Sequence, residues 1–78
     1  MKLRVWVIRN VPNKPTYYPV NSMKEASVLI NKMADRDLKN PNISNNAFGL
    51  EEFSDGEWSE HYNKHGDSID DYMDALEN

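Results

Sequence analysis

The stretch Lys2–Arg9, KLRVWVIR, decides the fold because it alternates strictly and is rich in β-branched residues. An extended chain points its side chains to alternate sides, with Leu3, Val5 and Val7 on one and Arg4, Trp6 and Ile8 on the other. Since both sides are largely apolar, the stretch predicts a β-strand in the middle of a sheet.

The segments after this strand predict a turn and an edge strand. Residues 10–15 hold two prolines and two asparagines, which remove ladder donors and favour bends. Residues 16–20, TYYPV, then predict a short second strand. Pro19 restricts that strand to the edge of the sheet, because proline has no N–H to donate to a neighbour.

An amphipathic helix is predicted next. Ser22 and Glu25 form an S-x-x-E capping box, in which each side chain accepts the amide proton of the other residue. Apolar residues then follow helical spacing, namely Ala26, Leu29, Ile30, Met33 and Ala34. We expect Leu38 to pack at the helix end, and residues 39–41 (KNP) to stop the helix.

A β-hairpin is predicted around Asp55-Gly56, which separates residues 47–53 from residues 57–62. A two-residue loop would set Phe53 opposite Trp58, and Glu51 opposite Glu60. A three-residue loop with a bulge at Gly56 would instead set Phe48 opposite Tyr62, and Glu52 opposite Trp58. Opposed carboxylates disfavour the first register, but the sequence does not choose between the two.

The C-terminal segment predicts a second turn and a short helix. Residues 63–66 (NKHG) form the turn, and Ser68 can cap a helix over residues 69–76. Asp70 and Asp71 fall in its first turn, where the helix dipole favours anions. Its narrow apolar stripe consists of Ile69, Tyr72, Met73 and Leu76.

These elements predict one α+β domain over residues 1–78, in which a small antiparallel sheet carries one main helix. The element order is ββαββ plus a short C-terminal helix, and we expect residues 69–78 to fray. The predicted core comprises Leu3, Val5, Val7, Ala26, Leu29, Ile30, Met33, Phe48, Leu50 and at least one of Phe53 and Trp58.

The charges divide sharply along the chain. Residues 1–42 hold eight Lys/Arg and three acids, a net of +5, whereas residues 43–78 hold Lys64 and ten acids, a net of −9. Concentrated like charge repels itself, so an acidic half suggests a basic partner. The candidate contact acids are Glu51, Glu52, Asp55, Glu57, Glu60, Asp67, Asp70, Asp71 and Asp74.

Most enzymatic and metal chemistry is disfavoured. The chain has no cysteine, no phosphate-binding glycine loop and no Ser/His/Asp arrangement with an oxyanion element. His61 and His65 are four apart but flank a turn, and the acids of residues 67–74 lack the alternation of a calcium loop. We therefore expect no enzyme, no metal and no cofactor. Without a signal peptide or a membrane-length apolar run, we expect a cytoplasmic protein.

The motif in residues 49–58, GLEEFSDGEW, resembles a hairpin found in small uncharacterised proteins of bacteriophages, prophages and mobile elements of Gram-positive bacteria. Residues 66–70 (GDSID) and 33–38 (MADRDL) add to the resemblance. The chain departs from the pattern at His61 and at residues 64–66, where a more acidic turn is expected. The resemblance implies a phage context and assigns no activity.

Phage-encoded acidic proteins of this size often occupy a host protein surface. The leading hypothesis is a non-enzymatic protein that binds a basic host protein, for example a defence nuclease, as an anti-CRISPR or anti-restriction type of nucleic-acid mimic. One alternative is a self-associating structural protein, in which the basic half of one copy meets the acidic half of another. A second alternative is single-strand binding through the basic half with Trp6, Tyr17 and Tyr18, which the pI of about 5.0 disfavours.

Overall fold

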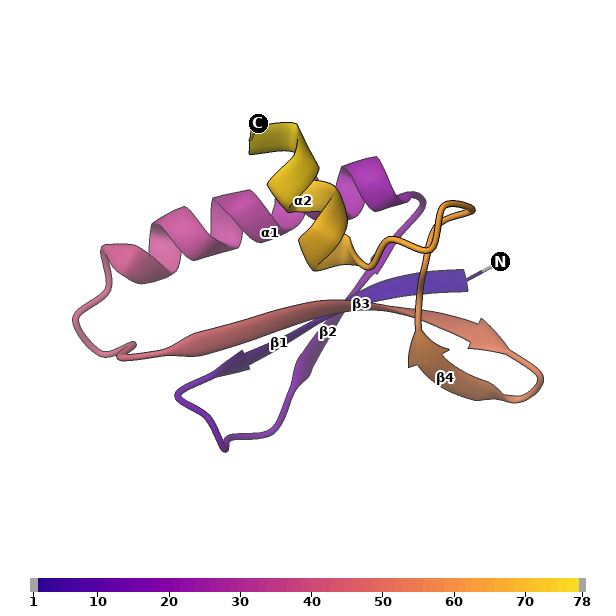
Figure 1. Cartoon of the computed structure of the whole chain (residues 1–78). Helices are drawn as coiled ribbons and strands as arrows, with labels where there is room; N and C mark the ends of the chain where they lie inside the picture. Colours follow the sequence, from indigo (N-terminus) through magenta and orange to yellow (C-terminus); the bar gives the residue numbers. More distant parts are fainter. Residues whose placement is uncertain (1, 78) are drawn as a thin grey trace.

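The computed structural model describes residues 2–77, which form one four-stranded antiparallel sheet and two helices (Figure 1). The elements in chain order are β1 (Lys2–Arg9), β2 (Thr16–Val20), α1 (Met23–Leu38), β3 (Asn46–Ser54), β4 (Glu57–Glu60) and α2 (Ile69–Glu77). The α+β class and the ββαββ order with a C-terminal helix are confirmed.

The strands lie in the order β2-β1-β3-β4, so β1 is an interior strand and β2 is an edge strand, as predicted. The register pairs Val5 with Tyr18 on β2 and with Leu50 on β3. Residues paired across an antiparallel sheet share a face, so these three point to one side. We call this side the inner face, and the opposite side, which carries Trp6 paired with Tyr17, the open face.

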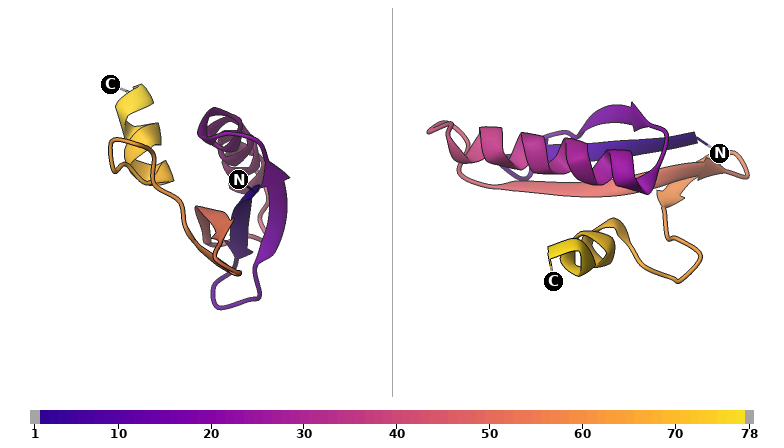
Figure 2. Two further views of the ribbon diagram at one scale, coloured as in Figure 1. Left: turned by 90° about the vertical axis from the view of Figure 1, so that its right-hand side faces the viewer. Right: turned by 90° about the horizontal axis from the view of Figure 1, so that it is seen from above.

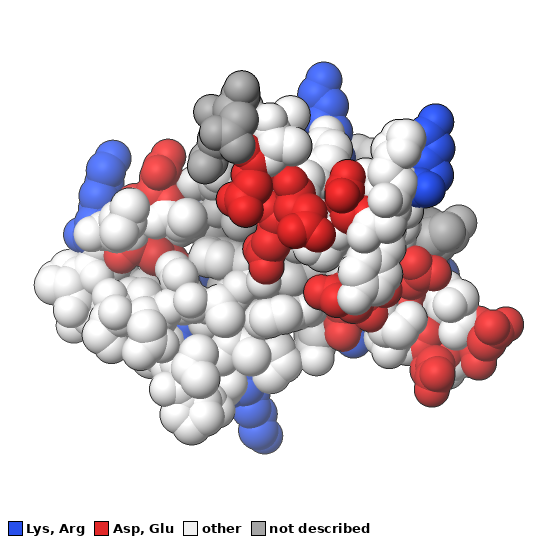
Figure 3. Space-filling view, in the orientation of Figure 1, with Lys and Arg blue, Asp and Glu red and all other residues white. Residues whose placement is uncertain are grey.

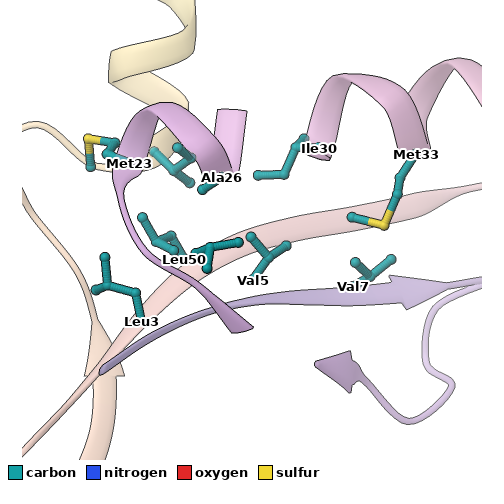
Figure 4. Close-up of a cluster of buried hydrophobic side chains, with 10 residues drawn as sticks. Leu3, Val5, Val7, Met23, Ala26, Ile30, Met33 and Leu50 are labelled. Carbon is teal, nitrogen blue, oxygen red and sulfur yellow. The ribbon is translucent and has the colours of Figure 1, made fainter. Parts of the chain in front are cut away.

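Both helices lie on one side of the sheet, where they cover the inner face (Figure 2). Figure 4 shows side chains of β1, β3 and α1 meeting in this layer. The buried core comprises Leu3, Val5, Val7, Val20, Met23, Ala26, Ile30, Met33, Leu50 and Ile69. Branched aliphatic residues from strand and helix therefore supply most of the buried apolar surface that stabilises the fold.

The predicted core needs four corrections. Leu29 and Phe48 are only partly buried against the core. Neither Phe53 nor Trp58 belongs to it, because their register places them on the open face. Leu38 does not pack at the helix end: it is 85% exposed. The predicted core also lacked Val20, Met23 and Ile69, which are all buried; Ile69 is 2% exposed and anchors α2 to the rest of the core.

Local polar contacts fix both ends of α1. Ser22 Oγ accepts from the amide of Glu25 at 3.0 Å, as the capping box predicts, but Glu25 accepts from the amide of Asn21 rather than Ser22. Near the C-terminal end, the carboxylate of Asp37 is 3% exposed and accepts from Arg9 Nε at 3.0 Å and from Asn46 Nδ2 at 3.0 Å. A buried charge with these partners ties α1 to β1 and to the start of β3.

Candidate functional site: an acidic surface beside an open sheet face

The hairpin between β3 and β4 turns on a two-residue loop. Asp55 and Gly56 have φ values of 52° and 82°, as the tight turns favoured between twisted strands require. Phe53 therefore pairs with Trp58, and Glu51 with Glu60, which is the first of the two registers left open by the sequence. The rings of Phe53 and Trp58 lie 5.3 Å apart at their centroids.

Each of the two facing carboxylates, Glu51 and Glu60, has its own hydrogen-bond partner. Arg4 Nε lies 2.8 Å from Glu51 Oε1, and the Tyr62 hydroxyl donates to Glu60 Oε2 at 2.5 Å. The hydrogen bond to Glu60, together with its negative charge, raises the pKa of the Tyr62 hydroxyl. These contacts explain how this register tolerates two acids facing each other.

A hydrogen-bonded turn leads from the sheet to α2. Asn63 Oδ1 accepts from the amides of His65 and Asp67 at 2.9 and 3.0 Å, and Gly66 has a φ of 81°. Ser68 Oγ accepts from the amide of Asp71, and Asp71 Oδ2 accepts from the amide of Ser68, each at 3.3 Å. This reciprocal cap confirms the predicted start of the C-terminal helix, and it sets Asp70 and Asp71 in its first turn.

The candidate acids fall into two groups. Glu51 and Glu52 are half-buried and have internal partners: Glu51 forms an ion pair with Arg4, and Glu52 Oε1 lies 2.9 Å from His61 Nδ1, within hydrogen-bond distance. The other seven lie on the hairpin, the turn and α2, and Figure 3 shows acidic side chains gathered over α2 and over the hairpin. We call these seven the acidic surface: Asp55, Glu57, Glu60, Asp67, Asp70, Asp71 and Asp74.

Of the acidic surface, only Asp67 is partly buried, and the other six acids are exposed. Asp67 contributes to the turn, where Asn63 Nδ2 lies 3.4 Å from its carboxylate. The acidic surface thus runs from the hairpin through the turn to α2, and Glu60 lies on the open face together with Glu51.

The open face was not identified as a unit by the sequence. The guanidinium of Arg4 lies between two rings, with Cζ 3.7 Å from the centroid of Tyr17 and 3.9 Å from that of Trp58. Beside it Trp6 lies flat on the backbone of Gly49, where an added Cβ would fall 2.2 Å from the indole ring. The alternation of residues 2–9 could have indicated that Arg4 and Trp6 share a face. That Trp58 lies on the same face follows only from the register of the hairpin.

Tyr18 takes a different position from the aromatic residues of the open face. It pairs with Val5 and packs partly buried against the core, whereas Tyr17 is 44% exposed. The aromatic residues of the basic half therefore do not form one surface.

The two histidines make different contacts. His61 is paired with Glu52, whereas His65 is exposed in the turn of residues 63–68. Within residues 2–77, no group of three His, Cys, Asp or Glu side chains is placed to hold a metal ion. Neither helix in this range is long and apolar enough to cross a membrane.

Comparison with known proteins places the chain in a family. The family model described as superinfection exclusion gene product 17 matches residues 2–78. No curated protein and no solved structure matches the chain. Since the match covers all but the first residue, this chain belongs to the superinfection exclusion gene product 17 family and is a small phage-encoded accessory protein that acts on its host.

Proposed function

We propose that the protein is a non-enzymatic binding protein that takes part in superinfection exclusion by occupying a basic surface of a host protein. The acidic surface makes the contact. In the sharpest form of the proposal, the host protein is a defence nuclease, and the carboxylates take the place of nucleic-acid phosphates in its binding groove.

One observation carries the proposal: six exposed acids lie on the hairpin and α2, whereas most of the exposed cations lie elsewhere on the chain. The exposed Lys and Arg side chains are Lys2, Lys14, Lys24, Lys32, Arg36, Lys39 and Lys64, and four of these belong to α1 or its cap. Of these, only Lys64 lies within residues 55–74, which hold the acidic surface. The hairpin and α2 therefore concentrate negative charge, whereas α1 exposes its cations together with Glu25 and Asp35. A surface dominated by one sign steers a protein toward a complementary partner.

The chemistry of carboxylates supports a partner rich in arginine. A carboxylate offers two anionic oxygens to a guanidinium fork, as a phosphate does, so an arginine that reads phosphates also binds Asp or Glu. Asp55 lies at the tip of the hairpin and Asp70 in the first turn of α2. Because these positions are exposed, binding a partner does not require the chain to break an internal ion pair.

A salt and competition series tests the proposal. The tagged chain is used to capture proteins from a host lysate, and each captured protein is purified and titrated with the chain. We expect an affinity that falls with added salt and that double-stranded DNA or RNA competes away. The variant Asp55→Asn/Glu57→Gln/Asp70→Asn should lose at least about tenfold in affinity, since each removed charge weakens the steering and the contact.

The matched control removes three positive charges from α1 and its C-cap, as Lys24→Gln/Lys32→Gln/Lys39→Gln. Binding that survives the acidic triple variant, or that falls equally in the lysine control, contradicts the assignment of the acidic surface. Binding that nucleic acid does not compete away contradicts only the mimicry of nucleic acid and leaves a host protein as the partner.

A further inference from the structure

Neither helix covers the open face of the sheet (Figure 2), and the register of the strands places aromatic and aliphatic side chains on it. Trp6 and Ile8 come from β1, Tyr17 from β2, Phe53 from β3 and Trp58 from β4. Tyr17 is 44% and Phe53 39% exposed, which is high for side chains of this size. Because Trp6 lies flat on Gly49, the middle of the face is low enough for another flat surface to approach closely.

The charges of the open face lie on opposite sides of the line between β1 and β3. Arg4 on β1 pairs across the sheet with Glu51 on β3, which in turn pairs with Glu60 on β4. The next position toward the hairpin holds Lys2, which pairs with Phe53. The β1 half therefore carries two cations and the β3–β4 half two carboxylates, and the face is close to neutral as a whole.

This arrangement is complementary to itself. A second copy turned by 180° about an axis parallel to the strands, between β1 and β3, lays β1 over β3 of its partner and β2 over β4. The cationic half of each copy then meets the carboxylate half of the other, as a twofold interface requires. Sheets that pack this way keep their strands nearly aligned at a separation of roughly 10 Å, which long Lys and Glu side chains can span.

We propose that the open face is the interface of a homodimer, in which two sheets pack face to face, with Lys2 and Arg4 of each copy lying over Phe53 and Glu51 of the other. The helices and the acids of the acidic surface other than Glu60 remain on the outside, so the dimer presents these acids twice. This proposal does not rest on the proposed function, because the open face holds only Glu60 of the seven acids in the acidic surface.

The same contacts disfavour a nucleic-acid strand on this face. Stacked bases need aromatic platforms, which are present, but the backbone also needs cations that are free to meet phosphates. Arg4 is already held by Glu51 at 2.8 Å and by two rings, and the face also carries Glu51 and Glu60. A second copy satisfies both signs of charge, whereas a polyanion satisfies only one.

Sedimentation equilibrium of the full chain tests the proposal at concentrations from about 10 μM to about 1 mM. We expect the mass to rise from 9.1 kDa toward twice that value. The open-face variants Tyr17→Glu and Phe53→Lys should raise the dimer dissociation constant at least about tenfold, because each puts a charge into the apolar contact. The control is Val28→Glu on α1, where the residue is 48% exposed and so matches Tyr17.

Charge reversal separates a direct contact from a change in folding. Phe53→Lys places a cation over Lys2 of the partner, and adding Lys2→Glu should recover at least several-fold of the lost affinity, because the facing charges are then opposite. Thermal unfolding at low concentration checks that each variant folds.

Three results would overturn the proposal. One is a wild-type chain that stays at 9.1 kDa up to the highest concentration, and another is a dimer that the open-face variants leave unchanged. The third is a monomer whose tryptophan fluorescence is quenched by a single-stranded oligonucleotide in a salt-dependent way, which would assign the face to nucleic acid instead.

Discussion

The two faces of the sheet are built from the same strands but differ in how they use their side chains. On the inner face Val5, Val7 and Leu50 are at most 1% exposed beneath the helices. On the open face the alternate positions of the same strands carry Trp6 and Phe53, which remain accessible. The inner face therefore stabilises the fold. Substitutions on the open face leave the core intact, and its exposed apolar side chains can contact another molecule.

The largest expected effect compares two apolar residues of β3. Leu50→Ala should lower the free energy of unfolding by about 2–5 kcal/mol, because a fully buried side chain leaves a cavity. Phe53→Ala should cost only about 1–2 kcal/mol, since the ring is 39% exposed and loses mainly its contact with Trp58. Urea unfolding at low protein concentration measures both, and equal losses would contradict the division between the faces.

A second comparison concerns one ion pair on each face of the sheet, Arg9–Asp37 on the inner face and Arg4–Glu51 on the open face. Asp37→Ala should cost about 1–3 kcal/mol, because Arg9 and Asn46 both lose their acceptor at a position that is 3% exposed. Glu51→Ala on the open face should cost less than about 1 kcal/mol, because Arg4 keeps its two rings and some contact with water. Urea unfolding measures both variants. A larger loss of unfolding free energy for Glu51→Ala than for Asp37→Ala would contradict the expectation that the buried ion pair contributes more.

A third prediction tests the flat position of Trp6. Gly49→Ala should displace the indole, since the new Cβ would fall 2.2 Å from its ring, at a cost of about 1 kcal/mol. Tryptophan fluorescence in a Trp58→Phe background reports the displacement. Gly56→Ala is the control, because that glycine has a φ of 82° with no atom near its Cβ, so it adds backbone strain and should leave the emission of Trp6 unchanged.

The smallest expected effect lies at the end of the hairpin. Glu60 raises the pKa of Tyr62, and Glu60→Gln should move that pKa back toward its ordinary value of about 10. Because the folded pKa is the higher one, the Glu60–Tyr62 contact stabilises the fold below pH 10 and is lost as the pH rises through the folded pKa. A spectrophotometric titration of the phenol measures the shift, and an unchanged pKa in the variant would contradict the contact.

Local sequence signals predicted the elements well, for reasons that the structure makes plain. The alternation of residues 2–9 and Pro19 located the central and edge strands, and the S-x-x-E box located the start of α1. Each of these signals acts within a few residues of the chain. Local patterns therefore sufficed for the order of the elements.

The errors arose where a residue's position depends on distant parts of the chain. A shift of one residue in the hairpin exchanges the faces, so Phe53 and Trp58 could not be assigned before the register was known. Ile69 is buried because the turn of residues 63–68 returns the chain to the sheet; the local pattern marked the turn and an apolar helix face, but not that this face reaches the core. Glu51 and Glu52 take part in internal contacts for the same reason, because Arg4 and His61 are brought to them by the pairing of the strands and by the chain after β4.

The plating efficiency of a second phage on host cells that express the chain tests the acidic surface most directly. We expect the wild-type chain and the lysine control Lys24→Gln/Lys32→Gln/Lys39→Gln to change plating alike. The acidic triple variant Asp55→Asn/Glu57→Gln/Asp70→Asn should lose most of that change at equal expression. Full activity of the acidic triple variant, with loss of activity in Tyr17→Glu, would contradict the proposed function and assign the contact with the host to the open face.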